Sequence, residues 1–341
     1  MTATASPSAP ATPAARLLGL DALRGIAAFC VVLFHVRTVF ETAPQYSPRA
    51  YLAVDFFFVL SGFVMARAYE TKLRAGFGGD RFFKARYRRL WPTIAFGSLL
   101  FVPYVREAAD GFNLVFFKVF IANMLLLPAI GENDFFPLNA PAWSIFFELV
   151  ANVIHGMVLW KLRSRALLAI VLVCLCGLAF KALDYGNLDV GAGKGEFVVG
   201  LLRVGFSYTL GILLWRHWGE RKVHRSAGWL ALVAMPILFA SITHGVMRPW
   251  ETDLTFVTLA SPLILVGGLA IRGGGRLAAL AGDLSFPLYA THFPVLYIAR
   301  DLGLSGDASI AACLVVAGAV TAVQLAWRQR RKSLPQPAPS S

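Results

Sequence analysis

Apolar segments of about 20 residues recur along almost the whole chain, and they constrain its fold more than any other feature. An α-helix needs about 20 apolar residues to cross a bilayer. The 341 residues are 57% hydrophobic and 15% charged, with a mean hydropathy of +0.63, unlike a soluble domain. We predict an all-α, polytopic bundle of about ten transmembrane helices, within the segments Leu18–Phe40, Tyr51–Tyr69, Leu90–Ile130, Trp143–Leu162, Arg165–Leu183, Phe197–Trp215, Trp229–Gly245, Leu254–Ile271, Leu284–Arg300 and Ala308–Trp327.

The distribution of lysine and arginine predicts the orientation. Cytoplasmic loops carry an excess of these residues, and the segment Arg67–Arg89 is strongly basic. This segment lies inside and Trp143 lies outside, so only one of the two apolar stretches between them can cross. We expect Trp91–Val105 to cross and Phe112–Ile130 to be re-entrant or packed in the bundle. Both termini are then cytoplasmic.

The composition of the chain ends predicts the domain organisation, and the net charge and the cysteines exclude some classes of ligand. Residues 1–15 are predicted to be a disordered tail, residues 16–328 one transmembrane domain, and residues 329–341 a basic, Pro/Ser-rich cytoplasmic tail. The net charge of +13 resides mainly in loops between spans, so we expect no nucleic-acid partner. The four cysteines lie in apolar spans without metal-ligand spacing, and no metal site is predicted.

The first span contains an arginine and a histidine eleven positions apart, Arg24 and His35. Eleven steps are almost three helical turns, so both side chains lie on one face, about 16 Å apart. Ionisable groups within a span normally mark a functional site. A neutral imidazole can act as a general base, and Arg24, oriented by Asp21, can hold a phosphate-bearing ligand. The alternatives are a hydrogen-bonded core histidine and an anchoring arginine.

A basic block precedes the third span. Within Arg81–Pro92, Arg86 and Arg89 lie one turn apart and are the best candidates to hold a phosphorylated donor, with Arg88 beside them. An interfacial amphipathic helix on anionic lipid is the competing interpretation.

Later spans carry polar side chains on one face. Ser144, Glu148, Asn152 and His155 form a stripe, which is either a functional site or a structural seam between helices. Ser285, Tyr289 and His292 form a second set. Arg203 lies mid-span and needs an acidic or carbonyl partner, for which Glu148 is one possibility. Asp55 is a further buried carboxylate candidate, and Ser61 and Gly62 permit close helix packing.

Five sequence blocks carry a resemblance to a known family: LDALRGIAAFCVVLFHV, VDFFFVLSGFVMA, RFFKARYRRLWPT, PAWSIFFEL and LSFPLYATHFPV. In this order they are similar to the acyltransferase 3 family of membrane-bound O-acyltransferases. The resemblance implies about ten helices, an acyl-CoA donor from the cytoplasm, and transfer to a hydroxyl, usually of a sugar. It implies that His35 is the essential histidine, that Arg24 is its partner, and that Arg86 and Arg89 serve the coenzyme A phosphates. Glu148 matches the carboxylate of the WSxxxE block. Phe286 replaces a tyrosine that is frequent in the family.

We therefore expect an O-acyltransferase of the bacterial cytoplasmic membrane. The acyl group that we expect it to move is acetyl, and the acceptor is a glycan or glycolipid. Transfer is either direct or through an acyl-histidine. A transporter or flippase whose ionisable groups line a substrate path is the alternative. The expected site residues are His35, Arg24 and Glu148 for catalysis, Arg86, Arg88, Arg89 and Asp21 for the donor, and Asp55, Trp143, Tyr289, His292 and Arg203 for the acceptor.

Overall fold

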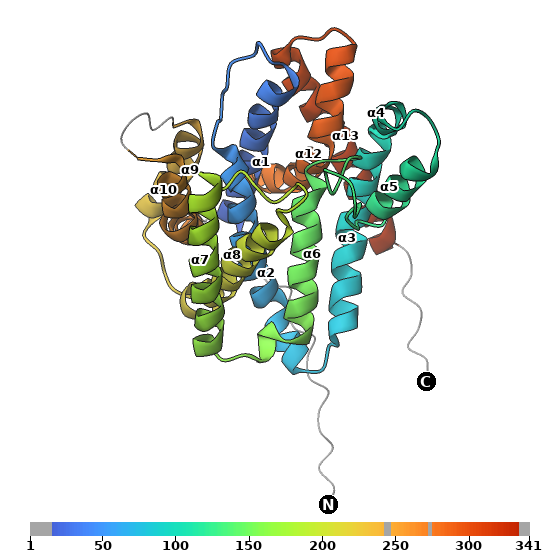
Figure 1. The fold of residues 1–341 in the computed structure, drawn as a ribbon. Helices are drawn as coiled ribbons and strands as arrows, with labels where there is room; N and C mark the ends of the chain where they lie inside the picture. The colour runs from blue at the N-terminus through green and yellow to red at the C-terminus, as the bar shows by residue number, and fades with distance from the viewer. Residues whose placement is uncertain (1–15, 242–246, 272–274, 334–341) are drawn as a thin grey trace, which may run out of the picture.

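The computed structural model describes residues 16–241, 247–271 and 275–333, and these are predominantly α-helical. The expected tail at residues 1–15 lies outside the described residues, as do residues 334–341 of the expected C-terminal tail. The α-helices, in chain order, are α1 Leu18–Val39, α2 Ala53–Arg74, α3 Gly79–Leu100, α4 Val102–Ala108, α5 Leu114–Met124, α6 Ala142–Met157, α7 Ser164–Tyr185, α8 Phe197–Trp218, α9 Arg225–Ala240, α10 Pro249–Thr255, α11 Ser261–Gly268, α12 Gly275–Asp301 and α13 Gly306–Ser333 (Figure 1).

Within the residues that the structure describes, five helical stretches are long and apolar enough to cross a membrane, judged by length and composition. They are Leu18–Val39, Ala50–Arg74, Ser164–Tyr185, Phe197–Trp218 and Gly306–Arg330. The chain is therefore a multi-pass, all-α membrane protein. The remaining predicted spans correspond to α3, α6, α9, α12 and the pair α10 and α11, which a π-helical turn at Phe256–Ala260 joins.

The structure differs from the prediction between residues 79 and 130. The sequence predicts a span at Trp91–Val105 that the basic block precedes, but one helix, α3, begins at Gly79 and runs through the block to Leu100. Pro92 does not break this helix, because one proline removes only one backbone hydrogen bond. The following α5 has 11 residues, about 16 Å of helix, and cannot cross a hydrocarbon core of about 30 Å. That Phe112–Ile130 does not span the membrane stays a prediction, and the shortness of α5 is one reason for it.

Close helix contacts determine which side chains meet in the interior. The most extensive contacts join α1 to α12, α2 to α8 and α12 to α13, while α3 packs against α6 and α12. A Cβ atom on Gly62 would lie 2.0 Å from the carbonyl oxygen of Tyr208, so α2 and α8 approach at backbone distance. This confirms the predicted role of Gly62 in close packing. Small residues allow such contacts in membranes, where van der Waals packing largely drives helix association.

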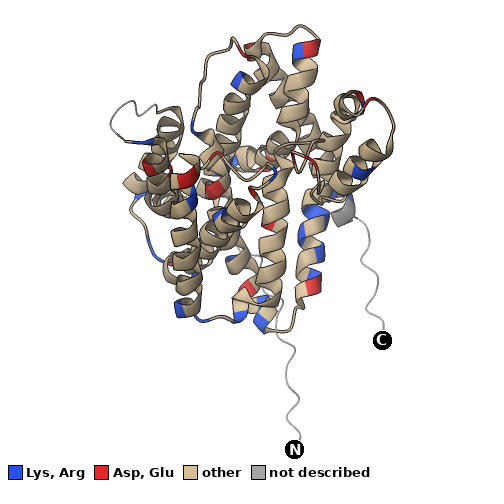
Figure 2. Ribbon diagram, viewed as in Figure 1, with Lys and Arg blue, Asp and Glu red and all other residues tan. Residues whose placement is uncertain are grey.

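Basic residues gather at one end of the bundle. Figure 2 shows Lys and Arg at the end where α2 finishes and where α3 and α7 begin. Arg74, Lys161, Arg163 and Arg165 belong to this end. In a membrane protein such an asymmetry is typical of the cytoplasmic side.

Candidate functional site

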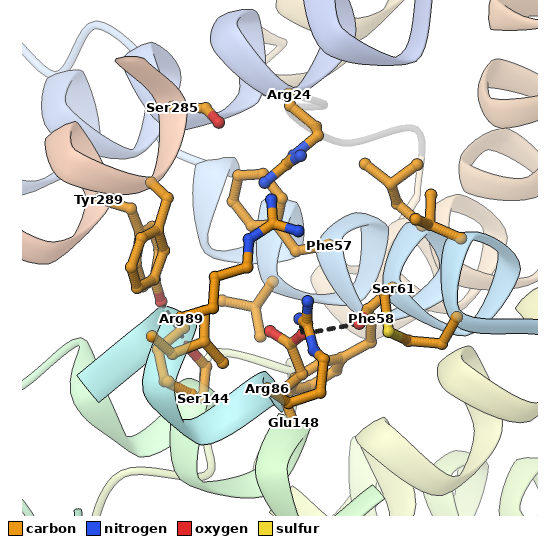
Figure 3. Close-up of a pocket in the computed structure, with 17 residues that line it drawn as sticks. Arg24, Phe57, Phe58, Ser61, Arg86, Arg89, Ser144, Glu148, Ser285 and Tyr289 are labelled. Atoms are coloured by element: carbon orange, nitrogen blue, oxygen red, sulfur yellow. Dashed lines mark hydrogen bonds and ion pairs between the residues drawn. The ribbon is translucent and has the colours of Figure 1, made fainter. Parts of the chain in front are cut away.

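Five helices, α1, α2, α3, α6 and α12, enclose a pocket in the interior of the bundle (Figure 3). It holds about 790 Å³ of empty space, including its open mouth. Its charged lining consists of three arginines, Arg24, Arg86 and Arg89, and one glutamate, Glu148. The pocket therefore carries a formal excess of two positive charges and favours an anionic ligand.

Glu148 binds one of these arginines directly. The Nη2 atom of Arg86 lies 2.7 Å from Oε1 of Glu148, and the hydroxyl of Ser61 donates to the same oxygen at 2.6 Å. Arg86 is 6% exposed, so its charge is buried, and Glu148 is half-buried beside it. These contacts join α2, α3 and α6 at the pocket wall. Buried arginines need such a partner, because an unpaired buried charge is costly.

The other two arginines are not neutralised in this way. Arg24 and Arg89 form no hydrogen bond or ion pair with another residue in the described part of the chain. Figure 3 shows both side chains directed into the pocket, one from α1 and one from α3. Arg89 is also exposed, which places it at the open side of the pocket. Two free guanidinium groups can bind phosphate or carboxylate oxygens with paired hydrogen bonds.

Two hydroxyl groups, from Ser144 and Tyr289, form another part of the pocket wall. Ser144 Oγ and the Tyr289 hydroxyl lie 2.7 Å apart, and both also contact the carbonyl oxygen of Pro141. The pair ties α6 to α12. Tyr289, which the sequence assigns to the acceptor, thus lies at the pocket wall, although no ligand contact is needed to explain its hydrogen bonds.

His35 lies beyond the pocket, further along α1. The pocket lining includes Arg24 but not His35, and the two residues are about 16 Å apart along the helix axis. His35 is half-buried. Its Nδ1 atom lies 2.9 Å from the carbonyl oxygen of Val31 and 3.2 Å from Nε2 of His292. The His292 ring in turn lies 5.9 Å from that of Tyr289, at the pocket wall.

Three of the expected site residues form a separate buried cluster. Arg203 donates to Asp55 at 2.6 Å, and its guanidinium lies 5.3 Å from the ring of Trp143. Arg203 and Asp55 are 1% and 0% exposed and do not line the pocket. The suggestion that Glu148 is the partner of Arg203 is wrong, since Glu148 pairs with Arg86. The cluster joins α2 to α8 and stabilises the packing of these two helices.

Two of the expected donor-binding residues also lie outside the pocket lining. Asp21 forms an ion pair with Arg16 rather than with Arg24, and Arg88 is exposed and does not line the pocket. The polar stripe of α6 is divided between two roles. Ser144 and Glu148 line the pocket, whereas His155 and Asn152 hydrogen-bond to Tyr208 and form a seam with α8.

Sequence reasoning missed the contact of Ser61 with Glu148. The serine stood out only for its small size beside Gly62, and no pattern within α2 shows which helix it faces. Among the described residues no cluster of three or more His, Cys, Asp or Glu side chains could hold a metal ion.

Comparisons with known proteins support the resemblance found in the sequence. Residues 17–328 match the profile of a family described as "Acyltransferase domain". A protein of Rhizobium radiobacter named "Protein 2 in picA locus" is 36% identical over 172 residues, which cover 45% of this chain and 86% of that protein. No solved structure matches the chain.

Proposed function

Because the chain belongs to the acyltransferase 3 family, whose domain covers residues 17–328, we propose that this membrane acyltransferase moves an acetyl group from acetyl-CoA to a hydroxyl of a glycan or glycolipid. The observation that carries the proposal is a cationic pocket whose Arg24 lies about 16 Å from His35 along one helix. An acyl-coenzyme A has a matching arrangement, because its phosphates and its thioester lie at opposite ends of a long arm. The phosphates correspond to the cationic pocket and the thioester to His35.

The pocket residues suit the charged end of this donor. Arg24 and Arg89 have free guanidinium groups, and we assign them to the phosphates. Arg86 adds positive charge but is already held by Glu148. We therefore assign Glu148 to positioning Arg86, in place of the catalytic role expected from the sequence. The same excess of positive charge attracts the donor from the cytoplasm.

His35 serves as the general base in this proposal. Its imidazole removes the proton of the acceptor hydroxyl while the oxygen attacks the thioester carbonyl. The new C–O bond forms, the C–S bond breaks, and the proton passes from the imidazole to the departing thiolate of coenzyme A. The competing route through an acyl-histidine has the imidazole attack first. A rapid acid quench of a reaction with labelled donor separates the two, because only the second route labels the protein.

The membrane topology completes the proposal. We propose ten crossings, made by α1, α2, α3, α6, α7, α8, α9, the α10–α11 pair, α12 and α13, with α4 and α5 at the outer surface. Both termini then face the cytoplasm of a bacterium, with the enzyme in the inner membrane. The pocket mouth at Arg89 opens from the half of α3 that carries the basic block, on the side where acetyl-CoA is made available.

The direct test supplies labelled acetyl-CoA to inverted membrane vesicles that contain the protein. Label in extracted glycan or glycolipid supports the proposal and identifies the acceptor fraction. Absence of label from every fraction, with the protein inserted and the host's glycan present, would contradict it and favour a transport function.

A further inference from the structure

A second histidine, His292, contacts His35, the proposed general base. It lies on α12, is 0% exposed, and does not line the pocket. Its Nδ1 atom lies 2.8 Å from the carbonyl oxygen of Tyr289 and 3.2 Å from that of Leu288. Carbonyl oxygens only accept hydrogen bonds, so this nitrogen carries a proton. In a neutral imidazole the other nitrogen, Nε2, is then an acceptor.

The acceptor nitrogen of His292 faces His35. The Nδ1 atom of His35 lies 3.2 Å from it and 2.9 Å from the carbonyl oxygen of Val31. Both neighbours are acceptors, so Nδ1 of His35 must be the protonated nitrogen. Its Nε2 atom then carries a lone pair, and it forms no hydrogen bond with any residue that the structure describes.

A further contact holds this part of α12 in place. Pro294 has no N–H group, which leaves the carbonyl oxygen of Ala290 without its usual helical partner. The side-chain amide of Asn139 donates to that oxygen at 2.8 Å. The turn that carries His292 is thereby tied to the segment before α6, which limits the movement of the ring.

We propose that His292 is a positioning residue that fixes the tautomer of His35, so that the free Nε2 atom of His35 is the base. This inference rests on the proposed acyl transfer. During the reaction Nε2 of His35 takes the hydroxyl proton and later gives it to the thiolate leaving group. The Nδ1 proton stays in place, and the two acceptors at Nδ1 stabilise the transient imidazolium.

Two substitutions of similar bulk separate this role from mere packing. In His292→Gln the amide oxygen can occupy the position of the imidazole Nε2 atom and accept from His35. In His292→Asn the shorter amide reaches only the position of Nδ1. We expect His292→Asn to lower kcat by about 10²-fold or more with KM for acetyl-CoA changed less than about threefold, and His292→Gln to lose less than about tenfold.

The tautomer can also be measured without activity. The ¹⁵N spectrum of the histidine-labelled protein separates protonated from unprotonated ring nitrogens, and His35→Gln identifies the signals of His35. We expect His35 to be protonated at Nδ1 alone in the wild-type protein and in His292→Gln, and to exchange between tautomers in His292→Asn.

The outcomes separate this inference from the proposed function. Equal kcat losses in folded His292→Gln and His292→Asn, or a proton on Nε2 of His35 in an active wild-type protein, would overturn the positioning role alone. A wild-type protein that transfers no acyl group would overturn the proposed function, whatever its tautomers.

Discussion

The guanidinium of Arg86 lies 2.7 Å from the carboxylate of Glu148, in a pocket where Arg24 and Arg89 have no such partner. One arginine is thus part of the protein's framework, and two remain available to a ligand. The distinction matters because all three look alike in the sequence. Because of this difference, substitutions can test the structural role of Arg86 and the binding roles of Arg24 and Arg89 separately.

The first prediction concerns stability. Glu148→Ala leaves the charge of Arg86 buried and unpaired, so we expect the free energy of unfolding to fall by about 3 kcal/mol. The double variant Arg86→Met/Glu148→Leu should recover most of this loss without recovering activity, because the pair is replaced by apolar side chains. Denaturant unfolding in detergent measures the first value. Wild-type stability in Glu148→Ala would show that the ion pair is not formed.

The second prediction concerns donor affinity. Each charge-assisted contact to phosphate contributes about 1.5–3 kcal/mol. We therefore expect Arg24→Ala and Arg89→Ala each to raise KM for acetyl-CoA by roughly 10- to 100-fold, with a smaller effect on kcat. Steady-state kinetics at several salt concentrations measures this, and the wild-type KM should rise with salt.

Lys84→Ala is the matched control for the donor pocket, because Lys84 lies on the same helix but is exposed and pairs with Asp80. Arg88→Ala should behave like this control. A KM increase in Arg88→Ala equal to that in Arg89→Ala would restore the interpretation drawn from the sequence, in which the whole basic block binds the donor.

The third prediction concerns the buried cluster at Arg203. Because this side chain pairs with Asp55 away from the pocket, we expect Arg203→Ala to lower the free energy of unfolding by about 3–5 kcal/mol. KM for acetyl-CoA should stay within about twofold in the protein that still folds. A large KM change with normal stability would return Arg203 to the substrate site.

The Arg203 cluster shows what the sequence can and cannot predict. Apolar runs predict the helices, and the helical period places Arg86 and Arg89 on neighbouring positions of one face. The partner of a side chain depends on how helices distant in sequence are rotated and packed against each other. That is why the sequence left Glu148 open as the partner of Arg203, whereas packing of α2 against α8 brings Asp55 to it.

The boundary of α3 was unpredictable for a similar reason. The basic block can form an amphipathic helix at the membrane surface, so the sequence suggests that the span starts only after it, at Trp91. In the structure the helix continues through the block because Arg86 faces Glu148 and Arg89 faces the pocket. An interior site can thus accommodate charges that lipid could not.

The fourth prediction concerns topology. In a variant without native cysteines, Ser305→Cys, in the turn between α12 and α13, should react with a membrane-impermeant maleimide in intact cells whose outer membrane has been permeabilised. Arg163→Cys, in the basic turn before α7, should react only in inverted vesicles. The reverse pattern would invert the proposed orientation, and labelling of both from one side would change the number of crossings.

The most direct test of the function is acetyl transfer from labelled acetyl-CoA in inverted vesicles, with His35→Ala beside the wild-type protein and His217→Ala. His217 is an exposed histidine at the end of α8 and lies outside the pocket, so it controls for the loss of an imidazole. We predict labelled glycan or glycolipid with the wild-type protein and His217→Ala. With His35→Ala, transfer should fall by at least about 10²-fold at equal protein insertion. Undiminished transfer by His35→Ala would contradict the central role of this histidine.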